Sequence, residues 1–260
     1  MPGSFGNSPT DDGAQTSCAA ANRNGLFARN DSTATATEPG GNGVFGLTVA
    51  PGGTGVFGAN NAPAGSPGRG VQGNGPEAGV GGFSETGIGV IAQSGGIGIK
   101  ATAPTAGHFD GNVEVTGDIS FLGPGADCAE DFDVVDPTAA EPGTVMVLDD
   151  AGGVHVSNGA YDTRVAGVIS GAGKHRPAVI LDRQGQSEAR RPVALIGKVY
   201  CKVDATAVPV AIGDLLTTSS TPGHAMKALD RERAFGAVLG KALQPCAGAR
   251  RLIPIIVALQ

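Results

Sequence analysis

The residues best suited to chemistry lie in one acidic run, Asp127-Cys128-Ala129-Glu130-Asp131-Phe132-Asp133. A thiol beside carboxylates suggests either self-cleavage, with Cys128 attacking an adjacent carbonyl, or a cation held by the carboxylate oxygens. Neighbouring carboxylates raise the pKa of a thiol instead of activating it, and the run lacks the spacing of a calcium loop. The simpler expectation is a solvated acidic turn with Cys128 buried. Asp127 and Cys128 are the candidate residues for self-cleavage, and no metal or cofactor is expected.

Several glycine patterns imitate nucleotide-binding loops. A dinucleotide site needs a helix after the glycines and an acidic residue about 20 positions on. No helical pattern follows any of the three G-x-G-x-x-G segments, which are Gly41 to Gly46, Gly53 to Gly58 and Gly68 to Gly73. The run from Gly171 to His175 resembles the end of a phosphate loop but has His where Ser or Thr is required, so it predicts a turn. None of the four histidines can be paired with the acidic run from sequence.

The elements that position these residues begin with a repeated Gly-aliphatic-Gly unit. Its successive units start between 8 and 15 residues apart, at Gly43, Gly55, Gly70, Gly79, Gly87, Gly96 and Gly107. Variable loops on a constant strand are typical of a β-solenoid or interleaved β-helix. Eight residues of strand span only about 26 Å at roughly 3.3 Å each, too short for a three-sided coil. The pattern therefore predicts that three chains share each turn, as a homotrimer.

Composition divides the chain near residue 125. Residues 1–125 hold 30 of the 44 glycines but only 4 of the 18 Lys and Arg residues. We expect an N-terminal attachment segment over 1–40, then a β-helical shaft over 41–125 and a β cap over 126–260. Residues 11–21 fit either one short helix or a frayed terminus. Disorder is the alternative for residues 30–110, because few apolar side chains are available there. The regular placement of Val and Ile after glycine argues against it.

Charge and cysteine content exclude several classes. The net charge is −6 with a pI near 5.2 and no run of Lys or Arg, so nucleic-acid binding is not expected. The sequence has no apolar stretch of 18 residues and opens without a charged-then-apolar leader. These features predict synthesis in the cytoplasm without a signal peptide and no membrane insertion. The four cysteines form no C-x-x-C pair, so free buried thiols are expected.

The second half reads as an antiparallel β barrel or sandwich of short strands separated by turns. A helical turn or two is expected within Ala225 to Arg233. The apolar run at the C-terminus should be buried or packed between subunits, with Pro254 at a strand edge or start. Strands are predicted at Thr144–Leu148, Arg164–Ser170, Ala178–Leu181, Val193–Val203, Asp214–Thr218, Phe235–Leu243 and Leu252–Leu259.

The chain resembles phage tail-fibre and neck-appendage proteins over roughly residues 95 to 260. The resemblance lies in Gly107-His108-Phe109-Asp110-Gly111, the acidic run, and the segments Arg164 to Ser170, Pro192 to Val199 and Gly213 to Ser219. It implies a β-helical shaft, a trimer, and a C-terminal intramolecular chaperone domain that some members remove by self-cleavage. No nucleophile and base match residue by residue, and the Ser-Asp cleavage signature is missing.

These observations favour a structural homotrimeric fibre or spike of a phage tail or of a phage-derived contractile injection particle. Its N-terminal end would dock on a tail or baseplate protein, and its cap would drive trimerisation and face a cell-surface receptor. Alternatives are a self-cleaving chaperone domain, a bacterial self-assembling surface fibre, and a polysaccharide-degrading tailspike. The tailspike is disfavoured because glycan platforms use aromatic faces, and the chain has no Trp and two Tyr.

Overall fold

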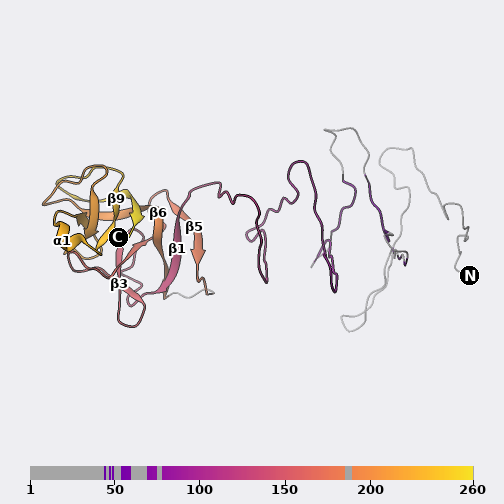
Figure 1. Ribbon diagram of the computed structural model, residues 1–260, viewed down its shortest axis with the longest axis horizontal. Helices are drawn as coiled ribbons and strands as arrows, with labels where there is room; N and C mark the ends of the chain where they lie inside the picture. Colours follow the sequence, from indigo (N-terminus) through magenta and orange to yellow (C-terminus); the bar gives the residue numbers. More distant parts are fainter. Residues whose placement is uncertain are drawn as a thin grey trace, which may run out of the picture. The chain divides into compact units, whose positions relative to one another are not determined.

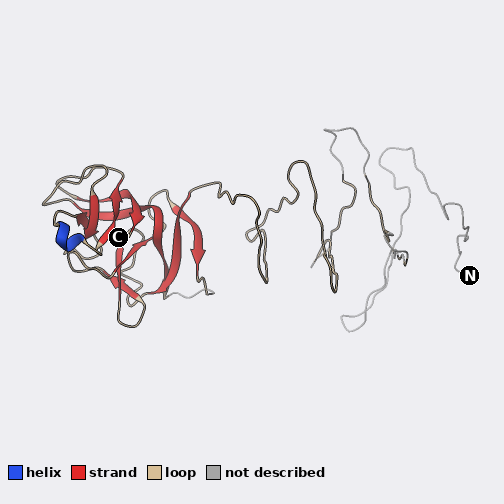
Figure 2. Cartoon of the chain, viewed as in Figure 1, coloured by secondary structure: helices blue, strands red, loops and turns tan. Residues whose placement is uncertain are grey.

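The computed structural model describes residues 44, 47, 49, 54–59, 69–74, 78–184 and 189–259. The chain divides into two units, Met1–His108 and Phe109–Gln260. All ten strands and the one helix of the described residues belong to the second unit, so this part of the chain is nearly all β (Figures 1 and 2). The predicted attachment segment 1–40, including residues 11–21, lies outside the described residues.

Five strands of the second unit close into a barrel. Their order is β10, β9, β7, β8 and β6, and the ring closes where β10 pairs with β6 from Arg250↔Asp204 to Ala258↔Ile196. This confirms the predicted barrel, except that β6 and β8 pair in parallel at Val203↔Ala225. The barrel strands are β6 (Arg190–Asp204), β7 (Leu215–Thr218), β8 (Ala225–Lys227), β9 (Val238–Ala242) and β10 (Arg250–Ala258).

The other five strands extend from the long strand β6. On one side β4 pairs with β6, β2 with β4 and β3 with β2, all antiparallel. On the other, β1 pairs antiparallel with β6 and parallel with β5. Their bounds are β1 (Gly125–Asp133), β2 (Val145–Leu148), β3 (Val154–Val156), β4 (Val165–Ile169) and β5 (Arg176–Leu181).

Two hydrophobic clusters stabilise this unit. The larger fills the barrel around Val199, Leu216 and Leu239, and the smaller lies under β2, β3 and β4 around Met146 and Val154. In β10 the buried side chains Ile253, Ile255 and Val257 alternate with more exposed neighbours, as a strand with one face on the core requires.

The seven predicted strands are all present, but three more were missed. The acidic run is strand β1 and not a solvated turn, and β3 and β8 were also not predicted. The helix is only one turn, α1 (Arg231–Ala234), capped by the Asp230 carboxylate, and Ala225–Lys227 is strand instead. The segment 171–175 is a turn, as expected, with Gly171 and Gly173 at positive φ.

Pro254 lies in the middle of β10, which corrects the prediction of an edge or start. It pairs with Tyr200 of β6, and its carbonyl accepts from Leu243 N at 3.0 Å. The nitrogen and carbonyl of a strand residue point to the same side, so the missing N–H faces the side where β9 has already ended at Ala242. The proline therefore removes only the reciprocal bond to Leu243, at the point where the pairing with β9 ends.

In the first unit, no strand is assigned to any described residue, and a β-helix is not seen. Glycines instead make close backbone approaches between consecutive repeats. A Cβ on Gly70 would lie 2.8 Å from Gly58 O, and one on Gly79 would lie 2.8 Å from Gly73 O. At these crossings only glycine fits, which explains the repeated glycine.

Candidate functional site

Asp127 is a buried carboxylate inside the folded unit. Its side chain is 3% exposed, and its Oδ2 accepts a hydrogen bond from Ser170 Oγ at 2.8 Å. Among the described residues Oδ1 has no partner. Burial raises the pKa of this carboxyl, and the Ser170 hydrogen bond opposes the rise. Burial of this carboxylate in β1 therefore costs folding free energy, and Asp127 is not part of a solvated turn.

Cys128 is half-buried between β5 and β6, opposite Val179 and Ile196. A nucleophilic thiol needs a base within hydrogen-bond reach. In the described part of the chain, no hydrogen bond to this thiol is found. The ring nitrogens of His155 and His224 contact carbonyls, and His175 packs against Tyr200. The two candidate residues thus lie side by side in sequence without forming a nucleophile–base pair.

The described residues also contain no group of three His, Cys, Asp or Glu side chains arranged to hold a metal ion. Of the other described cysteines, Cys201 and Cys246 are free and buried, as predicted. Burial strongly raises the pKa of the Cys201 thiol. Cys128 is more exposed than predicted because it lines an open hollow on the surface.

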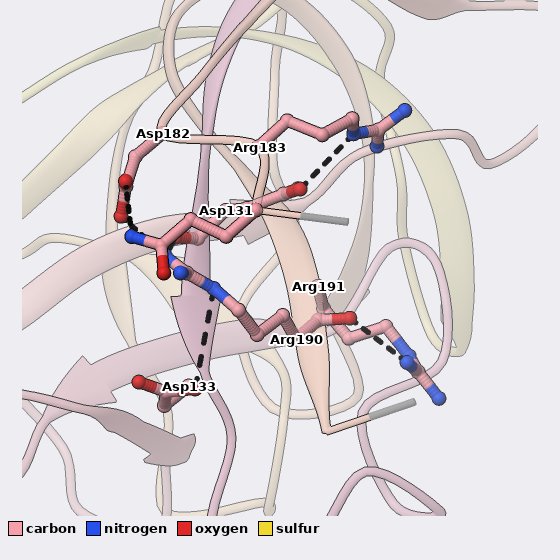
Figure 3. Close-up of polar contacts among 7 residues, drawn as sticks. Asp131, Asp133, Asp182, Arg183, Arg190 and Arg191 are labelled. Carbon is pink, nitrogen blue, oxygen red and sulfur yellow. Dashed lines mark hydrogen bonds and ion pairs between the residues drawn. The ribbon is translucent and has the colours of Figure 1, made fainter. Parts of the chain in front are cut away.

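The second buried carboxylate of β1, Asp131, is held by arginines (Figure 3). Its Oδ2 accepts from Arg183 Nε at 3.1 Å, and its backbone carbonyl accepts from Arg190 Nη2. Arg190 also donates to Asp182 and lies 4.0 Å from Asp133 Oδ1. We call Asp131, Asp182, Arg183 and Arg190 the arginine clamp. It joins β1 to the connection between β5 and β6.

Electrostatics favour the ionised form of this clamp. Hydrogen bonds from Gln184 and Arg190 lower the pKa of Asp182, and the bond to Asp182 raises the pKa of Arg190. The Arg190 side chain is only 12% exposed, so a carboxylate partner is needed to offset its lost hydration. The clamp fixes the position of β1, the strand that directly follows residues 109–122. The clamp was not predicted from the sequence.

The carboxylate of Asp204 joins several segments at one end of the barrel. Asp204 Oδ1 accepts from Thr206 N at 3.0 Å and Thr206 Oγ1 at 2.6 Å, and Oδ2 accepts from Thr221 Oγ1 at 2.6 Å and Arg250 Nε at 2.9 Å. These bonds hold its pKa far below the usual range. They join the end of β6, the start of β10 and the turn between β7 and β8.

The most extensive unexplained surface is apolar. Every large apolar side chain described between residues 44 and 122 is at least 50% exposed, nineteen in all. Examples are Phe57 at 83%, Phe83 at 88% and Leu122 at 96%. A single soluble chain does not normally expose so many large apolar groups over one stretch. This arrangement offers no catalytic group and is suited to association.

No protein-family model and no curated protein sequence matches the chain. Among solved structures it is similar to the crystal structure of the pre-mature bacteriophage phi29 gene product 12, with 13% identity and a TM-score of 0.42. The match covers 58% of this chain and 24% of that one, so the chain spans about a quarter of that protein's length. A likeness at this level says nothing about function in this chain. In the described ranges the one helix has four residues, so none of them holds a helix able to cross a membrane.

Proposed function

We propose that this chain is a structural subunit of a homotrimeric fibre or spike, of a phage tail or of a phage-derived contractile injection particle. The observation that carries this is the exposure of nineteen large apolar side chains between residues 44 and 122. Burial of one such side chain contributes about 1.5–3 kcal/mol. Repeated over nineteen side chains, this exceeds the whole stability of a typical domain, about 5–15 kcal/mol. Two further copies of the chain are the proposed cover.

The glycine crossings support an ordered repeat in this region. Gly58 with Gly70, Gly73 with Gly79, and Gly82 with Gly89 each bring two backbones within contact distance. Low-complexity linkers have no reason to place glycine at every crossing and a branched apolar residue beside it. In the proposed trimer these apolar residues point toward the shared axis, and an interleaved β-helix forms when the three chains meet.

In this proposal the barrel unit acts as a cap. Three glycine-rich strands specify their register weakly, and a slip of one residue would turn each inward side chain outward. A unit with its own hydrophobic core can align them before the shaft forms. The N-terminal end then docks on a tail or baseplate protein, and the cap presents the distal surface to a cell-surface receptor. The particle is extracellular once assembled.

The test is native mass spectrometry of the purified full-length chain, with sedimentation as an independent check. The proposal expects one species at three times the 25.6 kDa chain mass. It also expects amide protection over residues 78–122 that is missing from any monomer produced by dilution. A stable monomer at micromolar concentration would refute the proposal. Trimers without protection in residues 78–122 would refute the shared shaft while keeping a trimeric cap.

A further inference from the structure

The surface beside strand β5 combines an open sheet edge with an apolar hollow. Of the described strands only β1 pairs with β5, so the far edge of β5 keeps free backbone donors and acceptors. Next to it lies a shallow hollow of about 430 Å³. Its lining includes Phe121, Ala178, Val179, Ile196 and Lys198. Ile196 and Phe121 are 62% and 54% exposed. Exposed edges of this kind are usually covered, and an added strand is a common cover.

One lysine lines this hollow, and two further basic residues are found near the start of β5. Lys198 belongs to its lining, and Lys174 and Arg176 are exposed at the start of β5. His175 beside them packs against Tyr200, and burial together with the charges of Lys174 and Lys198 lowers the pKa of its ring. The one acidic residue of the lining, Asp127, is bound to Ser170 inside the fold. Lys198 is therefore the one exposed charged residue of the lining.

Residues 109–122, which precede β1, have the complementary character. They contain Asp110, Glu114 and Asp118 and no Lys or Arg. Val113 with Val115, and Ile119 with Phe121, are each two residues apart, so an extended segment presents them on one face. In this chain these four side chains are between 50% and 64% exposed. Of the segment only Phe121 contributes to the hollow of its own chain.

We propose that the edge of β5 and its hollow receive residues 109–122 of a second copy of this chain. The contact is heterologous, since a segment on one copy meets a hollow on the next, and such contacts close into a ring when three copies are related by a threefold axis. Val113, Val115 and Ile119 of the segment fill the hollow, while Phe121 stays in the hollow of its own chain. The backbone of the segment adds to β5, and its carboxylates face Lys198 and Lys174. This inference rests on the proposed trimer and names the surfaces that hold it together.

Charge reversal in the full-length chain tests the contact. Lys198→Glu and Glu114→Lys each place like charges together at all three contacts of a trimer. Each single variant should weaken trimer formation about 10- to 100-fold in sedimentation equilibrium. The double variant should recover most of the loss. Lys241→Glu, the same change on the exposed position of β9, is the matched control and should leave assembly within about threefold of the wild type.

A second measurement needs no variant. Light and ¹⁵N-labelled wild-type chains are refolded together and treated with a carbodiimide, which joins an amine to a carboxylate without a spacer. We expect crosslinked peptides that join Lys198 to Glu114 or Asp118 and carry one light and one heavy partner. Crosslinks only within chains of one label would overturn the inference, because the segment then folds back on its own hollow.

The outcomes separate the two proposals. A monomeric wild type refutes the fibre and this contact together. A trimeric wild type whose three charge variants behave like the Lys241→Glu control, with no mixed crosslinks, refutes the contact alone. In that case the trimer forms through the exposed apolar residues of the shaft without the edge of β5.

Discussion

Asp204→Asn tests how the barrel is closed. The carboxylate accepts four hydrogen bonds, from Thr206 N, Thr206 Oγ1, Thr221 Oγ1 and Arg250 Nε, at 2.6–3.0 Å. Its side chain is 10% exposed, so water does not replace these bonds when the carboxylate is lost. Asparagine keeps one carbonyl oxygen and directs an NH₂ group at donors. Hydrogen bonds to a charged group contribute about 1.5–3 kcal/mol each.

Part of this hydrogen-bond free energy is recovered in the variant, because Arg250 is 58% exposed and is hydrated again when it is released. A net loss of about 2–4 kcal/mol follows, which lowers Tm by roughly 5–15 °C in a unit of this size. Circular dichroism at one fixed chain concentration measures it. Asp150→Asn is the matched control, since the Asp150 side chain is fully exposed and its change should stay within about 0.5 kcal/mol.

The pH dependence provides a second check on Asp204. Its folded pKa is depressed, so the contribution is complete above the unfolded value of 3.8 and is lost as pH falls from there toward the folded pKa. The Tm difference between wild type and Asp204→Asn should be constant from pH 6 to 8 and shrink below about pH 4. An Asp204→Asn protein as stable as the Asp150→Asn control at pH 7 would refute the reasoning, as would a difference independent of pH.

Three further predictions concern other parts of the chain. Asp127→Asn should become less stable relative to wild type as pH falls from 8 to 4. Because the pKa of Asp127 is raised, the folded wild-type chain takes up a proton at higher pH than the unfolded chain does. Chemical denaturation at each pH measures the difference in unfolding free energy, and a difference that shrinks as pH falls contradicts the prediction. Iodoacetamide followed by peptide mapping should modify Cys128 well before Cys201, which is buried and has a raised pKa, and equal rates would show that the barrel opens readily. Gly79→Ala should reduce trimer yield because the new Cβ meets Gly73 O at 2.8 Å, whereas a Cβ on Gly95 meets nothing within 4 Å, so equal yields for Gly79→Ala and Gly95→Ala exclude the crossing as a requirement.

Seven of the ten strands could be predicted because their sequences follow local rules. Val165 to Ile169 and the run ending at Ala258 are rich in branched residues, and each has a turn glycine at positive φ beside it, Gly171 after the first and Gly248 before the second. The sequence did not distinguish a barrel from a sandwich. A barrel requires β10 to pair with β6, which lies about fifty residues earlier in the chain. Local pattern contains no information on such a partner.

Strand β1 was missed for a different reason. Its buried positions include Asp127 and Asp131, and alternating acidic residues read as a solvated segment. Their partners, Ser170 and Arg183, lie 43 and 52 residues away. The only sequence signal was the cluster of arginines at 183, 190 and 191 at the ends of one strand connection. Such a cluster indicates that buried carboxylates need a counter-charge somewhere in the fold.

The arginine clamp also connects the two proposals in physical terms. Residues 109–122 combine acidic residues with exposed apolar side chains, and this composition alone does not fix where the segment lies. The clamp secures β1, which begins at Gly125, and so fixes the point from which the preceding segment leaves the folded unit. A segment tethered at a fixed point reaches the hollow of a neighbouring copy at a much higher effective concentration than a free one. In the proposed assembly this gives a reason for burying Asp131 and Arg190, because stability alone would be served as well by apolar residues at these positions.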